Sequence, residues 1–163
     1  MKYRSWLIGL VGIALPAMLI AQQVLLEGAP SKGVGHVTYV AEPESVPAGK
    51  AGVLELRFKV DDGFHVNSHT PKSELLIPTA VTMKAADGVK VGAVEYPVGT
   101  SYSFSFDPSE KLDVYTGEFV VKLPVVAQAG MHTIDGSLRY QACDKAACYP
   151  PKSLPVQVMV TAK

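Results

Sequence analysis

Strict alternation of apolar and charged side chains is the feature that most constrains the fold of this chain. From residue 54 to residue 60 the apolar set is Leu54, Leu56, Phe58 and Val60, and the charged set between them is Glu55, Arg57 and Lys59. Successive side chains of a β-strand point to opposite faces, so this period of two predicts a strand with one buried face. Asp61, Asp62 and Gly63 follow directly, and residues of these types favour a turn at the end of the strand.

The same alternation returns along the rest of the chain, whereas helical periodicity does not. Shorter apolar alternations occur in segments 89–93, 102–106, 134–140 and 156–160. Segment 64–67 is a candidate start of another strand, and segment 119–126 is rich in β-branched valines although it contains Pro124. After residue 35 no run of ten residues has apolar side chains at helical spacing, and the best helical candidate, 71–76, is a single turn. The pattern predicts an all-β fold, an immunoglobulin-like antiparallel β-sandwich, with a barrel as the alternative architecture.

The N-terminus has the features of a targeting segment. Lys2 and Arg4 precede an apolar run over residues 6–21, which is interrupted only by glycines and Pro16. A charged start followed by an apolar stretch of this size is typical of a secretory signal peptide, and an uncleaved membrane-anchor helix is the alternative. Both place Lys2 and Arg4 inside and export the remainder. We therefore expect a signal or anchor at 1–21, a linker at 22–35 and a β-sandwich domain at 36–163.

Charge and composition exclude two classes of function. Lys and Arg together number 15 and Asp and Glu together number 15, so the chain has no net charge with which to hold nucleic acid. Hydrophobic residues make up 48% and charged residues 18%, which argues against a disordered, highly charged chain. We expect no nucleic-acid partner, and contact with a membrane only through the N-terminal segment.

The two cysteines of the chain, Cys143 and Cys148, are separated by four residues. So short a loop can bring their Cα atoms within the roughly 4.4–6.8 Å that a disulfide requires. The strands expected on either side, 134–141 and 155–160, place the pair at or near the end of a hairpin. A redox-active bond, a structural disulfide and a metal site all fit this spacing. A bond across so short a loop constrains the unfolded chain less than a long-range one does.

Two sequence blocks around the cysteines resemble a known family. Residues 140–143 read Tyr-Gln-Ala-Cys and residues 148–151 read Cys-Tyr-Pro-Pro, similar to the YQxC and CYPP blocks of the N-terminal periplasmic domain of the DsbD family, the thiol:disulfide interchange proteins. The segments 60–64 and 114–119 support the resemblance, which covers about residues 36–162. The number of residues between the cysteines departs from the family: the best-known members have five, and this chain has four.

The resemblance implies an immunoglobulin-like domain that exchanges disulfides. Such a domain takes electrons from a thioredoxin-like donor, a domain or a separate protein, and passes them to oxidised periplasmic proteins without an organic cofactor. Cys148 is then the partner-facing sulfur and Cys143 the resolving thiol. The two prolines after Cys148 support this assignment, because they cannot donate backbone hydrogen bonds and leave that segment open to a partner. The strand before Cys143 is expected to bury that cysteine. We expect a periplasmic or exported thiol-disulfide oxidoreductase of the protein-disulfide reductase type.

Several side chains are candidates to cap the cysteines or to face a partner. Tyr102, Phe104 and Phe106 form the densest aromatic stretch of the chain, and we expect at least one of these rings near Cys148; a strand face in the core is the alternative. The other candidates for a cap or a partner-facing surface are His65, Asn67, Tyr149 and Pro150.

The histidines at 65 and 69 leave two further readings open. Their spacing suits a metal on a helix, but Asn67 and Pro71 argue against a helix there, so we predict no metal site. Alternatively, a protonated His65 near Cys148 would lower the pKa of that thiol. The rival functions are a binding module whose disulfide is structural and a periplasmic metal carrier.

Overall fold

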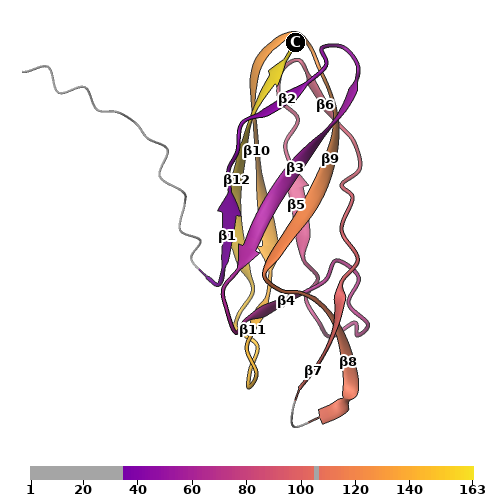
Figure 1. Cartoon of the computed structure of the whole chain (residues 1–163), viewed down its shortest axis with the longest axis vertical. Helices are drawn as coiled ribbons and strands as arrows, with labels where there is room; N and C mark the ends of the chain where they lie inside the picture. Colours follow the sequence, from indigo (N-terminus) through magenta and orange to yellow (C-terminus); the bar gives the residue numbers. More distant parts are fainter. Residues whose placement is uncertain (1–34, 105–106) are drawn as a thin grey trace, which may run out of the picture.

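The computed structural model describes residues 35–104 and 107–163 (Figure 1). The predicted signal or anchor segment, nearly all of the predicted linker, and Phe106 lie outside the described residues. The expectations about them, and the predicted domain boundaries, stay predictions. No helix among the described residues is long and apolar enough to cross a membrane.

Every regular element of the described residues is a β-strand. The strands are β1 (Val37–Val40), β2 (Glu44–Val46), β3 (Ala51–Val60), β4 (His65–Asn67), β5 (Ala80–Met83), β6 (Val89–Val91), β7 (Thr100–Phe104), β8 (Asp107–Tyr115), β9 (Glu118–Ala127), β10 (Gly130–Tyr140), β11 (Ala142–Cys143) and β12 (Lys152–Ala162). The predicted all-β fold is confirmed.

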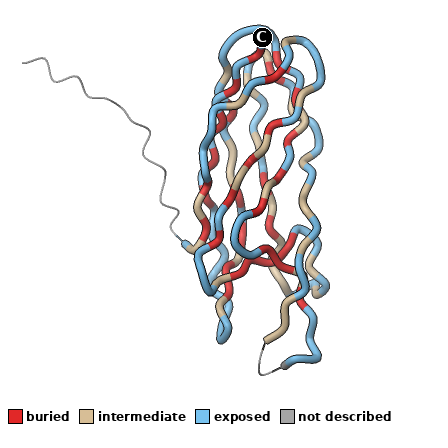
Figure 2. The backbone as a smooth tube through the Cα atoms, in the orientation of Figure 1, coloured by how far each residue is buried: buried red, intermediate tan, exposed pale blue. Residues whose placement is uncertain are grey.

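Two sheets form the body of the molecule. One has the strand order β1-β3-β9-β6 and the other β2-β12-β10-β5 (Figure 1). The buried residues follow the alternation that the sequence shows, and they line both sheets (Figure 2). On β3 the fully buried side chains are Leu54, Leu56, Phe58 and Val60, and on β12 the buried ones are Leu154, Val156, Val158, Val160 and Ala162. Together the two inner faces make one hydrophobic core, as the predicted sandwich requires.

One pair of strands departs from the predicted antiparallel arrangement. β2 runs parallel to β12, with Val160 opposite Glu44 and Ala162 opposite Val46. The chain moves from one sheet to the other between β1 and β2, where Pro43 lacks the N–H group that would continue the ladder. β1 and β12 run towards the same end of the molecule (Figure 1), and β2 continues in that direction, so it lies parallel to β12.

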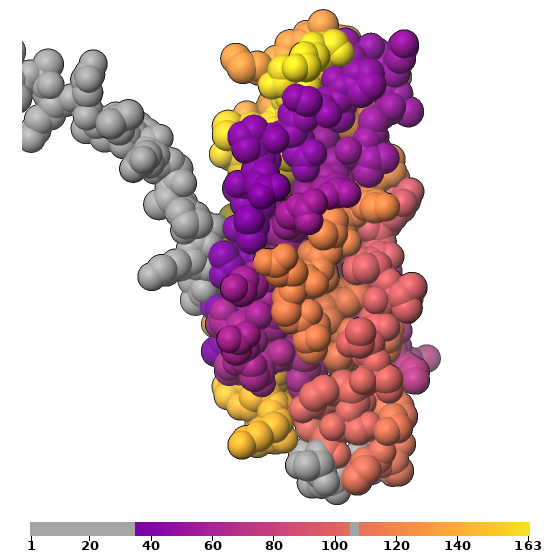
Figure 3. All heavy atoms as spheres, viewed as in Figure 1, coloured from indigo at the N-terminus to yellow at the C-terminus, as the bar shows by residue number. Residues whose placement is uncertain are grey.

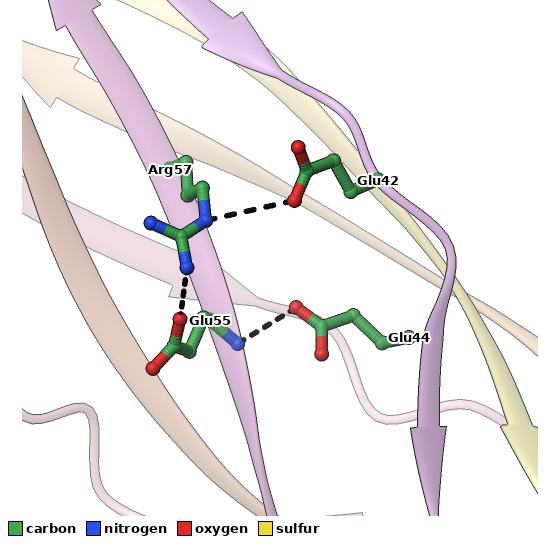
Figure 4. A network of polar contacts seen from close by, with 4 residues as sticks. All are labelled: Glu42, Glu44, Glu55 and Arg57. Carbon is green, nitrogen blue, oxygen red and sulfur yellow. Dashed lines mark hydrogen bonds and ion pairs between the residues drawn. The ribbon is translucent and has the colours of Figure 1, made fainter.

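A small charged network lies beside this crossing (Figure 4). The Arg57 guanidinium on β3 contacts the carboxylate of Glu55, and its Nε lies 3.5 Å from a Glu42 oxygen. The backbone N–H of Glu55 donates to the Glu44 carboxylate at 3.0 Å. The network links β3 to the crossing segment, although ion pairs as exposed as these contribute little to stability.

A third, smaller sheet gathers at the end of the sandwich opposite the C-terminus. Its strand order is β11-β4-β8-β7 (Figure 1). β10 and β12 pair without interruption from Gly130↔Ala162 to Tyr140↔Lys152, and the cysteine segment begins where that ladder stops. The cysteine hairpin and the β7–β8 hairpin both project at this end (Figure 3).

Candidate functional site

Cys143 and Cys148 form a disulfide, as the sequence predicts, and their Cα atoms are 3.9 Å apart, closer than the roughly 4.4–6.8 Å that is usual for a disulfide. The two residues lie directly opposite each other in an antiparallel bridge. Backbone hydrogen bonds flank them on both sides, from Tyr149 N to Ala142 O at 2.8 Å and from Asp144 N to Ala147 O at 2.9 Å. The cysteines therefore occupy a non-hydrogen-bonded pair, where strands of an antiparallel ladder approach most closely. This register is what allows so short a loop to be bridged.

The carboxylate of Asp144 organises the loop between the cysteines. Its Oδ1 accepts hydrogen bonds from the backbone N–H groups of Ala146 and Ala147 at 2.7 and 2.8 Å, and its Oδ2 accepts one from the Tyr149 hydroxyl at 2.8 Å. The bond from Ala146, followed by those from Tyr149 and Ala147, lowers the pKa of Asp144. The hydrogen bond to Asp144 in turn raises the pKa of Tyr149. The sequence interpretation missed Asp144, although an aspartate at the first loop position is a recognised turn signal.

The two sulfur-bearing residues differ completely in exposure. Cys143 is 0% exposed and belongs to β11, which pairs with β4. Cys148 is exposed and lies on the returning arm, before Pro150 and Pro151. The prediction that Cys143 would be the more deeply buried of the two is confirmed. Only Cys148 is open to an incoming thiolate in this state.

His65 lies opposite Cys143 in the β4–β11 ladder and is 1% exposed. Aromatic rings of β7 cover it, because the ring of Tyr102 is 4.0 Å from the imidazole and that of Phe104 is 5.9 Å away. These two rings meet edge to face at 5.6 Å, and neither is part of the buried core. The predicted aromatic segment thus lies over the residue beside Cys143. A ring contact with Cys148 itself stays a prediction.

The alternative of a protonated His65 beside Cys148 gains no support from the ladder register. The ladder partner of His65 is Cys143, not Cys148. Burial lowers the pKa of His65, and the smaller effect of the Asp144 charge opposes that shift. At neutral pH the imidazole is therefore uncharged and cannot favour a thiolate by its charge.

A second aromatic cluster, formed by His36, Phe64 and Tyr149, lies on the Cys148 side. The rings of His36 and Phe64 stack at 3.5 Å, and Tyr149 lies 5.5 Å from His36 and 6.0 Å from Phe64. A hollow of about 490 Å³ adjoins the cluster and includes Pro150 in its lining. Tyr149 and Pro150 are exposed, as expected of partner-facing residues. Sequence reasoning missed His36 and Phe64, because only the tertiary fold brings them to Tyr149.

The buried side chain of Asn67 links β4 to the cysteine segment by hydrogen bonds. Its side chain is fully buried, and Nδ2 donates to the Ile77 carbonyl at 3.0 Å and to the Gln141 amide oxygen at 3.5 Å. Gln141 in turn donates to the Tyr149 carbonyl at 3.1 Å. Asn67 and His65, expected at a capping or partner-facing surface, are thus both covered in this structure, and the polar bonds of Asn67 hold the site together.

His69 does not join His65 in a shared site. Its ring stacks on Tyr96 at 3.6 Å, and Nδ1 donates to the Thr79 carbonyl at 3.0 Å. Within residues 35–104 and 107–163 there is no group of three or more His, Cys, Asp or Glu side chains arranged to hold a metal ion.

Comparison with known proteins identifies the family. The family model described as "Thiol:disulfide interchange protein DsbD, N-terminal" matches residues 37–159. No curated protein matches the chain.

Three solved structures are similar to this chain. The reduced DsbD N-terminal domain of Neisseria meningitidis is 22% identical, with 73% of this chain and 82% of that chain covered and a TM-score of 0.46. The N-terminal periplasmic domain of ScsB from Proteus mirabilis is 12% identical, with 74% and 44% covered and a TM-score of 0.48. The complex of the DsbD and PilB N-terminal domains from Neisseria meningitidis gives 21% identity, 64% and 73% coverage and a TM-score of 0.44. With the family model matching most of its length, the chain belongs to the family of DsbD N-terminal domains.

Proposed function

We propose that this domain passes electrons between proteins by exchanging its Cys143–Cys148 disulfide, from a thioredoxin-like donor to oxidised periplasmic proteins. The observation that carries the proposal is the asymmetry of the bond, with Cys148 exposed and Cys143 fully buried. Membership of the family supports it. The donor and the acceptors are those that the family resemblance implies.

The exchange needs no cofactor, because the electrons travel on the sulfur atoms. A donor thiolate attacks Sγ of Cys148, a mixed disulfide forms, and Cys143 leaves as a thiolate that takes up a proton. The second thiol of the donor then attacks the donor sulfur that is bonded to Cys148. This step releases the oxidised donor and leaves the domain with two thiols. Reduction of an acceptor follows the same steps in reverse order. Cys148 carries both mixed disulfides; the donor's second thiol resolves the first, and Cys143 resolves the one with the acceptor.

The surface beside Cys148 is suited to a protein partner. Tyr149 and Pro150 are exposed there, next to the rings of Phe64 and His36. Pro150 and Pro151 have no N–H group and a fixed φ, so this arm stays extended and cannot fold back into a full ladder. Such a segment presents apolar area to an extended chain of the partner.

The domain works in the periplasm, where an exposed disulfide persists. The targeting segment expected at 1–21 supports export, either as a cleaved signal or as an inner-membrane anchor.

A pair of single-cysteine variants tests the proposal. Reduced Cys143→Ser is mixed with a thioredoxin that keeps only the exposed cysteine of its pair, activated as a mixed disulfide with 5-thio-2-nitrobenzoate. Attack by Cys148 releases the coloured thiolate and is expected to leave a covalent adduct on a non-reducing gel, because neither protein then has a second thiol to resolve it. Cys148→Ser is the matched control and is expected to form none. Equal adducts from both variants would contradict the assigned roles.

A measured reduction potential separates exchange from a structural bond. Structural disulfides typically lie below about −300 mV, and an exchanging bond is expected to be less negative. A wild-type bond that resists reduced thioredoxin, together with no adduct from either variant, would establish the structural reading instead.

A further inference from the structure

Three side chains stand in one row across the cysteine end. His65 on β4 is the ladder partner of Cys143 on β11, and Cys143 is in turn opposite Cys148 on the returning arm. Directly opposed residues of antiparallel strands project to the same face, with Cβ atoms roughly 4.5–5.5 Å apart. The imidazole therefore neighbours the buried member of the disulfide.

His65 carries a polar atom for which the described residues supply no hydrogen-bond partner. Its Nε2 is buried and has no hydrogen-bond partner among the described residues. Burial holds the pKa of the imidazole below its ordinary value, so at neutral pH the ring has one nitrogen with a free lone pair. The rings of Tyr102 and Phe104 cover this ring, which limits the access of water.

Cys143 needs a base when it resolves a mixed disulfide. Only the thiolate is a nucleophile, and a fully buried thiol ionises with difficulty because burial disfavours its charged form. Asp144, the nearby carboxylate, already accepts three hydrogen bonds, from two backbone N–H groups and the Tyr149 hydroxyl. The other titratable side chain facing His65 is Tyr102 on β7, a weak acid rather than a base at neutral pH.

On β8, the other strand paired with β4, the titratable partner in register is Tyr115, opposite Val66. Its hydroxyl donates to the Pro97 carbonyl and accepts from His69 N, away from the cysteine row. Among the described residues this leaves His65 as the base beside Cys143.

We propose that His65 accepts the proton of Cys143 during resolution and returns it in the reverse reaction. The inference rests on the proposed exchange function. With the partner bonded to Cys148, the Cys143 thiol gives its proton to Nε2 of His65. The thiolate then attacks Sγ of Cys148, the bond between Cys148 and the partner breaks, and the electron pair leaves on the partner sulfur. The proton held by His65 passes to that thiolate through solvent, so a thiol and a mixed disulfide become a new disulfide and a new thiol.

A small aromatic disulfide reagent allows the attack by Cys148 and the resolution by Cys143 to be followed as two separate kinetic phases. The reduced domain is mixed with one equivalent of 5,5′-dithiobis(2-nitrobenzoic acid). Attack by Cys148 releases one coloured thiolate, and resolution by Cys143 releases the second. Both phases are followed by stopped flow from pH 6 to pH 9.

His65→Phe keeps a ring beneath Tyr102 but removes Nε2. Its first phase is expected within about twofold of wild type. Its second phase is expected to be roughly 100-fold slower at pH 7, the low end of what a positioned base contributes. The second phase of the variant is expected to rise about tenfold per pH unit, following thiol ionisation alone, whereas wild type depends less steeply on pH. His69→Phe is the matched control and is expected to leave both phases unchanged.

An unchanged second phase in His65→Phe would overturn the proposal. A slower second phase with the wild-type pH dependence would also overturn it, because that result indicates a packing role. Should the phenylalanine variant fail to fold, His65→Gln takes its place with the same expected loss, since an amide cannot take up a proton in this pH range. The reagent requires no protein partner, so failure of the proton role and failure of protein-to-protein exchange are distinguishable.

Discussion

The two sulfur atoms of one disulfide lie in opposite surroundings. Cys143 is enclosed by the pairing of β11 with β4 and by the ring of Tyr102 over His65, whereas Cys148 is exposed beside Tyr149. The difference arises from the backbone: one arm of the hairpin belongs to a sheet, and the other continues into two prolines that cannot donate to one. A single covalent bond thereby offers one sulfur to a partner and protects the other for the resolving step.

The largest expected effect is in the chemical reactivity of the two thiols. After reduction, Cys148 is expected to react with iodoacetamide roughly 100-fold faster than Cys143, because Cys143 reacts only when the cysteine end opens locally. Peptide mass spectrometry of timed samples measures both rates. In concentrated urea the ratio should approach one. Similar rates in the native domain would remove the contrast on which the assigned roles depend.

A core substitution should lower the stability of the sandwich without changing the local opening of its cysteine end. Leu54→Ala removes a fully buried side chain that pairs with Leu123 in the body of the sandwich. Urea unfolding is expected to show a loss of about 2–5 kcal/mol in the free energy of unfolding. Well below the unfolding midpoint, the ratio of Cys148 to Cys143 alkylation should stay close to that of wild type. A collapse of that ratio would mean that the two regions open together.

Removing the aromatic cover should have the opposite result: a small loss of stability and faster alkylation of Cys143 alone. Tyr102→Ala is expected to speed alkylation of Cys143 by about three- to tenfold, with a loss of stability under about 1 kcal/mol, since Tyr102 is only half-buried. Tyr149→Ala is the matched control, because its ring lies on the Cys148 side. If both variants expose Cys143 equally, the ring of Tyr102 is not a specific cover.

Sequence patterns were sufficient where the structure depends on local periodicity. The alternation from Leu54 to Val60 predicts the buried face of β3, and the short spacing of the cysteines allows the bond that forms. The prolines after Cys148 also indicate which cysteine is exposed. Each of these features is determined within about ten neighbouring residues.

Features that depend on register or on distant contacts could not be predicted. β4 has three residues and β11 has two, so no alternation determines that His65 lies opposite Cys143, and a slip of one residue would turn the side chain to the other face. The cluster of His36, Phe64 and Tyr149 joins three separate parts of the chain. The parallel pairing of β2 follows from a change of sheet that no local pattern encodes.

The smallest expected effect concerns the loop between the cysteines, where Asp144 holds the exposed arm against the buried one. Hydrogen bonds from Ala146, Tyr149 and Ala147 lower the pKa of Asp144 below 3.8, so its contribution to stability is present above that pH and is lost as the pH falls through the lowered pKa. In NMR titrations the amide signals of Ala146 and Ala147 should therefore move with an apparent pKa below 3.8.

The titration of the Tyr149 hydroxyl at alkaline pH tests the same hydrogen bond. Its hydrogen bond to Asp144 raises the pKa of the phenol above 10.0, so wild type should ionise Tyr149 later than an ordinary tyrosine. Asp144→Asn removes the charge while keeping an oxygen acceptor for the two backbone N–H groups. The pKa of Tyr149 is then expected to fall towards 10.0, while the cysteine reactivity ratio changes less than it does in Tyr102→Ala, because Asp144 orders the exposed arm and leaves the cover of Cys143 in place. An unaltered Tyr149 titration in this variant would show that the hydroxyl does not donate to Asp144 in solution. The exposed arm would then be held by the backbone bonds from Tyr149 N to Ala142 O and from Asp144 N to Ala147 O, and by the Gln141 side chain.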